Sequence, residues 1–534
     1  KTVGLFQIES AGMREALIQM QPNHIEDIIA LVALYRPGPM SNIQIYNDCK
    51  HGRQKPDYLH PLLEEILKPT YGVIIYQEQV MQIAQKLSGF TAGQADLLRR
   101  AMGKKKRAEL ERQKQNFISG AVNNGIRKDI ATGIFLKIEP FAEYGFNKSH
   151  AAAYAIISYQ TAFLKTYYPK EFIAASMTMD ISNQNKLGEF YEELKRLKIE
   201  IFRPDINECY ADFRTENGKF YYALGGIKAV GYEAISNIVE ERLKNGKFKS
   251  IVDFLNRVNP KDINKLQLEG LTKAGAFDNI INNRRAFYDS IPNIILKSKN
   301  LFEKKLKNQI ELFSLNESTS NEQVILDRDE WKFQEKMLKE FETIGFYLSD
   351  HPLNQYKDIF IDYNITKYSD FINDKKNSQS IVAATILKIQ EKKTQKGTSY
   401  AIIKFSDLGS IFELFVFSDV FELNRDSIKE GNSVILTIFK NLSDNDQRVR
   451  TNVKKIIPID DIINKPINNL KIKIDNIENI ELLSKMLNIE GNAEIIFEIS
   501  KNNKKYTFKL KNKRYVDKNI LNSIKKQGIL ASIV

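Results

Sequence analysis

The spacing of apolar residues changes along the chain, and this change limits the folds that the chain can adopt. Residues 1 to about 200 carry apolar residues at helical spacing, in segments that proline and glycine separate. From Ser378 to about Asp460 apolar residues recur at every second position, as in strands with one buried face. A run of helices followed by a run of strands predicts separate domains, and 534 residues suffice for three or four.

Two helices are expected between Tyr71 and Lys106. Apolar residues from Ile74 to Ala84 approximate a 3.6-residue period, and Gly89 stands where a helix-ending glycine is common. Thr91 can cap a second helix, which Gly103 ends.

The second of these helices is basic at its end. Arg99 and Arg100 lie beside one face, and Lys104 to Arg107 follow directly. Guanidinium groups bind phosphate oxygens bidentately while ammonium groups add mobile charge, so the cluster suits a triphosphate or a nucleic-acid backbone. On charge alone, a solvated helix end favoured by the helix dipole explains the same residues.

The overall charge agrees with an acidic partner. The net charge is +13 and the isoelectric point is near 9.2, which favours nucleic acid over a membrane surface. Two cysteines, far apart, argue against a disulfide framework or a cysteine zinc site and fit a reducing cytoplasm. The sequence contains no apolar run of about 18 residues, so no membrane span is expected. Because the chain starts at Lys1 within a motif, we expect a piece of a longer protein.

Several longer motifs follow one another in a known order. LRRAMGKKK stands between YQEQVMQIAQ and YGFNKSHAAAYA, and the motifs GLFQIESAGM and RPGP precede them. Long motifs in the correct order are more specific than one short pattern. Over residues 1 to about 230, and more weakly to its end, the chain resembles the bacterial DNA polymerase III alpha subunit, the C-family replicative polymerase.

The resemblance implies a fingers domain over residues 1–200, with five contacts to the incoming dNTP or its phosphates: Arg36, Arg99, Arg100, Lys104 and Lys148. Arg36 precedes a Pro-Gly-Pro corner that a simple helix-ending turn also explains. Ser149 can cap the next helix. His150 lacks a nearby carboxylate and is expected to be structural or a phosphate donor rather than a general base.

Residues 201–300 are expected to form a tandem helix-hairpin-helix domain. The segment from Gly225 to Gly231 resembles the hairpin, whose turn offers backbone N–H groups to a DNA phosphate without reading bases. Ala229 stands where the hairpin usually has glycine. A dinucleotide fingerprint is the alternative, but its spacing and βαβ context are missing. The expected DNA contacts are Gly226, Lys228 and Gly231, and residues 265–278 are similar to the second hairpin of the family's tandem.

Five segments of period two between residues 378 and 460 predict an OB-fold β-barrel, whose exposed aromatic and cationic residues suit single-stranded DNA. Its expected contacts are Lys392, Lys393, Lys396 and Tyr400, with Phe405 as a further candidate. Residues 466–534 read as strand, helix, two strands and helix, a small α/β domain. In the family this end binds the tau subunit of the clamp loader. The fold class is thus multidomain α+β.

Residues 301–377 are expected to hold a clamp-binding motif and a linker. Gln309 to Phe313 has the form of the bacterial sliding-clamp-binding pentapeptide, with Gln309, Leu312 and Phe313 as the clamp contacts. The edge of a helix that packs on the preceding domain is the alternative explanation.

The resemblance also indicates what to expect of the chemistry. Family members hold Mg²⁺ on three palm aspartates, and no position of this sequence matches these aspartates. No segment of this sequence matches the family's PHP domain or thumb. The pairs Asp327/Asp329 and Asp444/Asp446 lie in polar stretches and are expected to be solvated. We therefore expect no catalytic residue and no metal ligand in this chain, and a link to the proofreading exonuclease subunit through the missing part. The chain is then part of a DNA-directed DNA polymerase, a nucleotidyltransferase, or a split or truncated DNA- and clamp-binding module.

We predict that replacing Leu312 and Phe313 together by alanine removes binding to the sliding clamp. Truncating two anchors of this kind costs on the order of 2–4 kcal/mol, whereas DNA affinity should stay nearly unchanged. Calorimetry with the purified clamp checks this, and equal clamp affinity of the double variant would contradict it.

Overall fold

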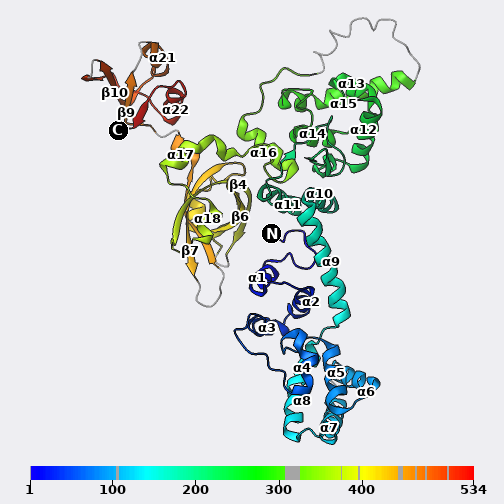
Figure 1. The fold of residues 1–534 in the computed structure, drawn as a ribbon. Helices are drawn as coiled ribbons and strands as arrows, with labels where there is room; N and C mark the ends of the chain where they lie inside the picture. Colours follow the sequence, from blue (N-terminus) through cyan, green and yellow to red (C-terminus); the bar gives the residue numbers. More distant parts are fainter. Residues whose placement is uncertain are drawn as a thin grey trace. The chain divides into compact units, whose positions relative to one another are not determined.

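The computed structural model describes residues 2–103, 107–306, 325–374, 376–394, 397–442, 449–463, 466–474, 478–501 and 504–533. The chain divides into two compact units, residues 1–248 and 249–534 (Figure 1). Within the described ranges, no helix is both long and apolar enough to cross a membrane.

The first unit begins with helices that pack against one long helix. Ser10 caps the first helix as expected, because its hydroxyl accepts from the N–H of Met13 at 3.2 Å. Apolar residues of these helices form one core, with Tyr46 and Leu31 fully buried. The helices are α1 (Ala11–Met20), α2 (Ile25–Leu34), α3 (Asn42–Lys50) and the long α9 (Lys148–Tyr167).

A second helical group of this unit has its own core, centred on Phe117 and Phe135. The predicted helix over Ile74–Ala84 begins later than expected, at Gln77, because Ile74 and Ile75 are buried in an extended segment. Gly89 ends it at φ 66°, as predicted, and Thr91 caps the next helix through the N–H of Gln94. The helices are α4 (Glu64–Leu67), α5 (Gln77–Ser88), α6 (Ala92–Gly103), α7 (Arg107–Asn123) and α8 (Lys128–Tyr144).

One short parallel bridge joins the starts of α5 and α9. Tyr76 pairs with Phe146, the N–H of Phe146 donates to the Ile75 carbonyl at 3.1 Å, and that of Gln77 donates to the Phe146 carbonyl at 3.0 Å. Two helices from segments about 70 residues apart in sequence therefore begin side by side.

The first unit ends with helices around a small sheet of order β1-β3-β2. Gly225 and Gly226 lie in a buried 3₁₀ turn before the last helix of the unit. The elements are α10 (Pro169–Met179), α11 (Gln184–Arg196), β1 (Ile201–Phe202), β2 (Arg214–Glu216), β3 (Lys219–Tyr221) and α12 (Tyr232–Asn245).

The second unit opens with helices that pack on one another. Phe277 contacts both Phe254 and Phe287, with ring centroids at 5.4 and 4.8 Å. Lys273 pairs with Glu342 at 3.0 Å and so ties α14 to α16. The helices are α13 (Ile251–Arg257), α14 (Lys265–Lys273), α15 (Arg284–Leu306), α16 (Phe333–Ile344), α17 (Lys357–Asp362) and α18 (Tyr368–Asn373).

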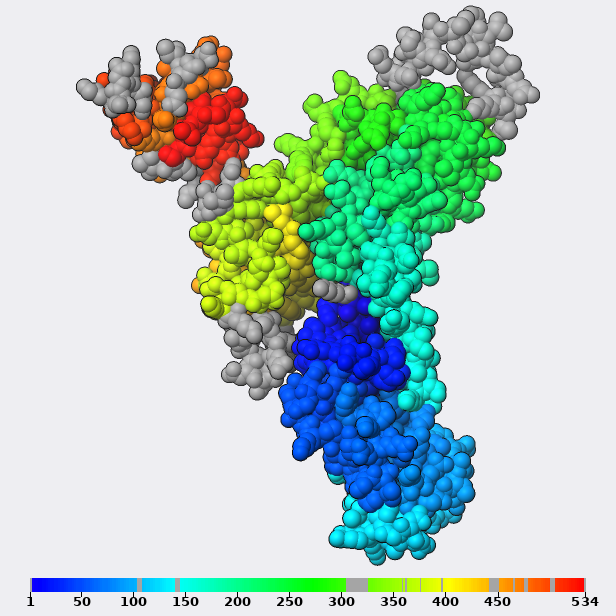
Figure 2. All heavy atoms as spheres, in the orientation of Figure 1, coloured from blue at the N-terminus to red at the C-terminus, as the bar shows by residue number. Residues whose placement is uncertain are grey.

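The predicted OB-fold agrees with the structure, in which five strands close a barrel in the order β4-β5-β6-β8-β7 (yellow-green to gold in Figure 2). The inward side chains, among them Ile403, Phe405 and Leu436, are fully or nearly fully buried. A short helix, Ser418–Leu423, lies between the third and fourth strands. The elements are β4 (Gln379–Lys393), β5 (Ser399–Ser406), β6 (Ile411–Val416), α19 (Ser418–Leu423), β7 (Ser433–Leu442), β8 (Val449–Pro458) and α20 (Ile459–Ile463).

The C-terminal residues form a small α/β domain with the sheet order β11-β10-β9-β12. The predicted sequence of strand, helix, two strands and helix is observed, and one short strand follows it. The elements are β9 (Asn469–Ile474), α21 (Glu478–Met486), β10 (Glu490–Lys501), β11 (Lys504–Lys509), α22 (Lys518–Lys526) and β12 (Ala531–Ile533).

A buried ion pair fastens α9 to α11. Lys165 and Glu193, whose side chains are 7% and 4% exposed, lie 2.5 Å apart, and Arg196 also donates to Glu193. Burial alone would raise the pKa of Glu193, but the hydrogen bonds from Arg196 and Lys165 lower it to about 2. The carboxylate therefore stabilises the fold above its unfolded pKa near 4.5, and this contribution is lost as the pH falls towards 2.

We predict that Glu193→Ala destabilises the first unit by about 3–5 kcal/mol, because Lys165 would keep a buried charge without its carboxylate. The variant should also lose much of the stability change between pH 4.5 and 2. Denaturant-dependent hydrogen exchange of the α9 and α11 amides measures both effects. Glu193→Ala combined with Lys165→Met is the control and should recover most of the loss; no recovery would show that the pair is not the cause.

Candidate nucleotide and nucleic-acid interface

Arg36 lies over an aromatic ring at the bridge between α5 and α9. Its guanidinium carbon is 4.3 Å from the Phe146 ring centroid, and its Nε donates to the Ala33 carbonyl at 3.0 Å. Since α2 ends at Leu34, the Pro-Gly-Pro corner holds Arg36 at this place. Partial burial lowers the pKa of Arg36. Guanidinium groups nevertheless stay protonated in proteins, so the residue is a fixed cation.

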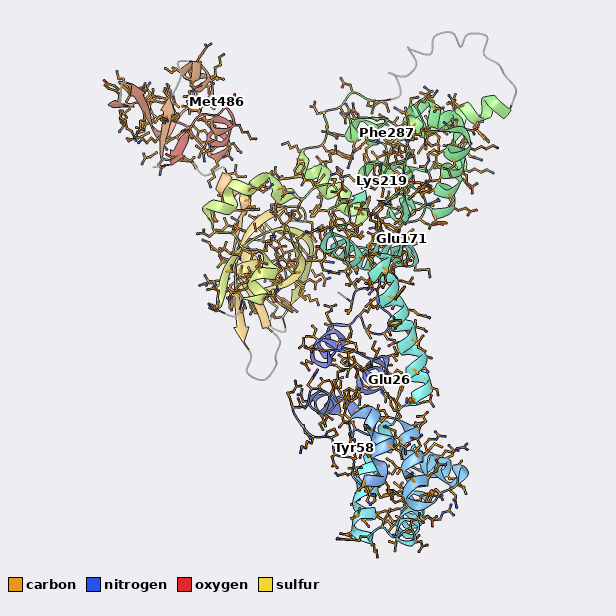
Figure 3. All side chains as sticks on the ribbon, viewed as in Figure 1. Glu26, Tyr58, Glu171, Lys219, Phe287 and Met486 are labelled. Atoms are coloured by element: carbon orange, nitrogen blue, oxygen red, sulfur yellow. The ribbon has the colours of Figure 1, made fainter. Side chains whose placement is uncertain are left out.

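Lys148 begins α9 on the other side of the same bridge. Its ammonium group lies 5.5 Å from the Tyr76 ring centroid. Burial raises the pKa of Tyr76, and the nearby carboxylates Glu26 (labelled in Figure 3) and Glu78 raise it further, so the phenol stays neutral. Arg36 and Lys148 thus each lie near one of the two aromatic residues that the bridge pairs, Phe146 and Tyr76.

The N-terminus of α9 already holds a carboxylate. Glu78 accepts from the N–H of Lys148 at 3.0 Å and from the Asn147 side chain at 2.9 Å. Asn147, rather than the expected Ser149, caps the helix, since its side chain accepts from the N–H of His150 at 2.8 Å. An anion brought to this place would therefore meet the Arg36 and Lys148 side chains instead of free helix N–H groups.

The His150 ring packs between two aromatic rings. Its centroid lies 5.3 Å from that of Phe146 and 4.5 Å from that of Tyr154. No carboxylate among the described residues is recorded in contact with the ring, which is the arrangement expected of a structural histidine.

Arg99 and Arg100 share one carboxylate that the sequence analysis missed. Asp96, three and four residues earlier on α6, lies 2.7 Å from each guanidinium. Hydrogen bonding to Arg99 lowers the pKa of Asp96, with a further contribution from Arg100. Spacing on a helix could have revealed this carboxylate.

The two arginines differ in their freedom to bind a ligand. Arg99 also donates to Gln77 at 3.4 Å and so belongs to the bridge. The Arg100 side chain is 61% exposed, and it is the more available of the two. Lys104, the other predicted phosphate contact, lies outside the described residues.

The first predicted hairpin exposes its turn at the start of α12. Lys228, Ala229 and Gly231 are exposed, and no side chain caps the helix. Ala229 takes the left-handed conformation, φ 65°, that glycine would normally supply. Gly226 is buried instead, and a Cβ there would lie 3.4 Å from the Phe213 ring, so Gly226 packs the turn.

The second predicted hairpin has an occupied turn. Gly275 at φ 83° sits against the buried Arg284, and a Cβ there would lie 2.1 Å from the guanidinium. Arg284 donates to Asp278 at 2.7 Å and to the Lys273 carbonyl at 3.0 Å. The side chain that fills this turn belongs to the chain itself, which leaves the turn's interior without room for a phosphate.

An aromatic pair lies on the outer face of the barrel. The rings of Tyr400 and Phe415 are nearly parallel, at 14°, with centroids 6.2 Å apart, and Lys392 pairs with Tyr400 across the strands. Phe415 and Phe417 are half-exposed and were missed, although alternation in IFELFVFS could have identified them. Phe405 is fully buried in the core and cannot contact DNA.

The remaining predicted residues are either exposed or lie outside the described part of the chain. Lys393 is exposed at the end of β4, and Lys396 lies outside the described residues, as do Gln309, Leu312, Phe313, Asp444 and Asp446. Among the described residues, no group of three or more His, Cys, Asp or Glu side chains could hold a metal ion, and Asp327 and Asp329 belong to no such group.

Two parts of the chain match models of known protein families. Residues 1–125 match the family model of the bacterial DNA polymerase III alpha subunit finger domain, and residues 198–287 match a helix-hairpin-helix motif. The resemblance seen in the sequence is thus confirmed for these two parts of the chain.

Curated relatives match over most of the chain, and each is a DNA polymerase III subunit alpha. The chain is 40% identical to that of Caulobacter vibrioides over 450 residues, 84% of the chain and 39% of the relative. It is 38% identical to that of Borreliella burgdorferi over 526 residues, 96% of the chain and 45% of the relative. The match to Rickettsia bellii is 41% identical over 447 residues, 78% of the chain and 38% of the relative. The chain therefore spans less than half the length of these relatives.

We predict that Ala229→Gly stabilises the first unit by about 0.5–1 kcal/mol. Glycine removes the cost of alanine in the left-handed conformation, about 1–2 kcal/mol. Part of this gain is lost because glycine gives the unfolded chain more conformational entropy. Urea unfolding measures the change. A clear loss of stability would show that the exposed methyl group of Ala229 contributes packing.

We predict that Lys228→Ala weakens binding to duplex DNA equally for unrelated sequences. One lost phosphate contact should make the slope of log affinity against log salt shallower by roughly one unit or less. Fluorescence anisotropy over a salt series measures the slope. Lys244→Ala, in the last turn of α12, is the matched control, because Lys228 lies just before the start of that helix. An identical effect of both variants would contradict a specific contact at the hairpin.

Proposed function

We propose that this chain works as part of a replicative DNA polymerase III alpha subunit, where it contacts the incoming dNTP, the primer-template DNA and the sliding clamp. The observation that carries the proposal is the bridge between α5 and α9. It places Arg36 near the Phe146 ring and Lys148 near the Tyr76 ring, in a chain whose residues 1–125 match the finger domain.

The arrangement suits a nucleoside triphosphate. A guanidinium held over a ring can bind two phosphate oxygens at once, and the ammonium group of Lys148 adds a second charge. Arg100 and Arg99 on α6, and Lys104 after it, are proposed to extend this basic surface along the phosphates. The role of these residues is binding and orientation of the nucleotide.

Mg²⁺ is proposed to be held elsewhere in the polymerase. When bound, it activates the primer hydroxyl and stabilises the departing pyrophosphate. The proposal assigns no catalytic carboxylate to this chain, because the resemblance gives no position here that matches the palm aspartates. The chain alone is accordingly proposed to be inactive.

The remaining parts are proposed to hold nucleic acid and partners. The exposed turn from Lys228 to Gly231 contacts one backbone phosphate of the duplex. The barrel face with Tyr400 and Lys392 binds single-stranded DNA, to which we add the half-exposed Phe415. The clamp binds residues 309–313, the tau subunit binds residues 466–534, and the exonuclease subunit binds a part of the polymerase outside this chain.

A second candidate function is a catalytically inactive DNA- and clamp-binding module. The absence of a metal-holding carboxylate group from the described residues favours it. The two candidates differ in one respect: only the first predicts that nucleotide contacts in this chain matter for synthesis.

We predict that the purified chain alone extends no primer and that extension appears once a segment with the metal-binding aspartates is added. Arg100→Ala should then lower kcat/KM for dNTP about tenfold or more, because charge-assisted hydrogen bonds to phosphate are lost. Arg127→Ala, an exposed arginine of the same unit, is the matched control and should change little.

Primer extension with varied dNTP concentration separates the outcomes. Mg²⁺-dependent extension by the chain alone would contradict the proposed division of labour. Normal extension by the Arg100 variant would favour the module over the polymerase.

A further inference from the structure

The C-terminal domain contains an apolar cavity that none of the functions above uses. Its volume is about 450 Å³, within the range of sites that bind ligands or partner side chains. One wall is α21 and the other is the strand pair β10 and β11 (Met486 marks this helix in Figure 3). The apolar lining comes chiefly from Ile480, Leu483, Leu487, Phe497, Ile499 and Phe508.

The apolar surface continues beyond the cavity. Phe508 pairs with Phe497 across the two strands and is 53% exposed, and Tyr506 pairs with Ile499 and is 47% exposed. Ile480 on α21 is 48% exposed. Large apolar side chains gathered at one place on a surface mark an interaction site rather than ordinary scatter. A surface of this extent suits a protein segment better than a small molecule.

The charges of the sheet are divided between its two faces. Glu494 and Glu498 alternate with the apolar residues of β10 and therefore lie on the opposite face. There they pair with lysines of the neighbouring strands, Lys471 at 2.5 Å and Lys509 at 2.7 Å. The carboxylates of Glu494 and Glu498 are thus occupied away from the cavity. The third acidic residue of β10, Glu490, pairs through its backbone with Arg514.

Arg514 lines the cavity without such a partner. In the described part of the domain its guanidinium has no recorded hydrogen bond or ion pair. Residues 466–534 contain 13 lysines and arginines against 7 aspartates and glutamates, a net charge of +6. An occupant with a carboxylate would therefore be attracted to the domain and held at the mouth of the cavity.

We propose that this cavity is the docking site for a short segment of a partner protein that places two or three apolar side chains in it and a carboxylate on Arg514. The inference rests on the proposed function in one respect, the assignment of residues 466–534 as a partner-binding domain. It adds the place of docking and the chemistry of the docked segment.

The test uses the full chain and two labelled 14-residue peptides. Both carry four leucines on one helical face; the other face carries glutamates in one peptide and lysines in the other. Fluorescence anisotropy should show the acidic peptide binding at least about tenfold more tightly than the basic one. Arg514→Glu should abolish or reverse this preference, and Ile480→Asp should weaken both peptides. Arg514→Lys should retain part of the preference.

Leu530→Ser is the matched control, since Leu530 is 61% exposed in the same domain and does not line the cavity. It should bind both peptides as the unchanged chain does, and thermal unfolding should show that all variants fold. Equal binding by the unchanged chain, the Arg514→Glu chain and the Ile480→Asp chain would overturn the inference. Absence of saturable binding to the unchanged chain up to about 1 mM would overturn it as well.

A parallel titration with the tau subunit encoded by the same genome separates the inference from the function on which it rests. If tau binds the unchanged chain and every variant alike, the docking site is wrong and the proposed partner stands. If tau does not bind while the peptides behave as expected, the partner is wrong and the docking site stands.

Discussion

The first unit depends on the parallel bridge between the starts of α5 and α9. Three consecutive side chains of α5 hold it from different sides. Gln77 donates to the Gly145 carbonyl at 3.0 Å, and Glu78 accepts from the start of α9. The buried Gln79 accepts from the N–H groups of Ile75 and Tyr76 at 2.8 and 3.0 Å. The N–H groups of Ile75, Tyr76, Gln77 and Phe146 are thereby hydrogen-bonded, as backbone groups at helix ends require.

This junction also fixes the basic residues around it. Arg36 rests on Phe146, Lys148 lies near Tyr76, and Arg99 reaches Gln77 from α6. Three cations, from the segment after α2, from α6 and from α9, approach the junction because one short bridge positions two aromatic rings and one amide. A carboxylate, Glu78, occupies the helix N-terminus among them, so the proposed contact with an anion relies on side chains rather than on the helix dipole.

The two predicted hairpins differ in what occupies their turns. In the first, the turn from Lys228 to Gly231 is exposed and its helix carries no side-chain cap. In the second, Arg284 and Asp278 fill the turn beneath Gly275. The guanidinium of Arg284 stabilises the second unit, because it joins α14 and α15. A similar division occurs in the C-terminal sheet, where lysines neutralise the glutamates on one face and Arg514 is left on the other.

The local pattern of the sequence determined the helices, the barrel and the caps at Ser10 and Thr91, because spacing and capping act over a few residues. It also marked Arg36, Arg99, Arg100, Lys148 and Lys228 as cations at special places in the chain. Pattern alone could not show that Asn147 and not Ser149 caps α9, nor that Gly226 is buried, nor that Arg284 closes its own hairpin. Each of these depends on a partner that capping and spacing rules do not reach: Glu78 for Asn147, Phe213 for Gly226 and Gly275 with Asp278 for Arg284. Tertiary structure alone decided which polar groups meet, because burial and hydrogen-bond satisfaction are properties of the packed chain and not of any short segment.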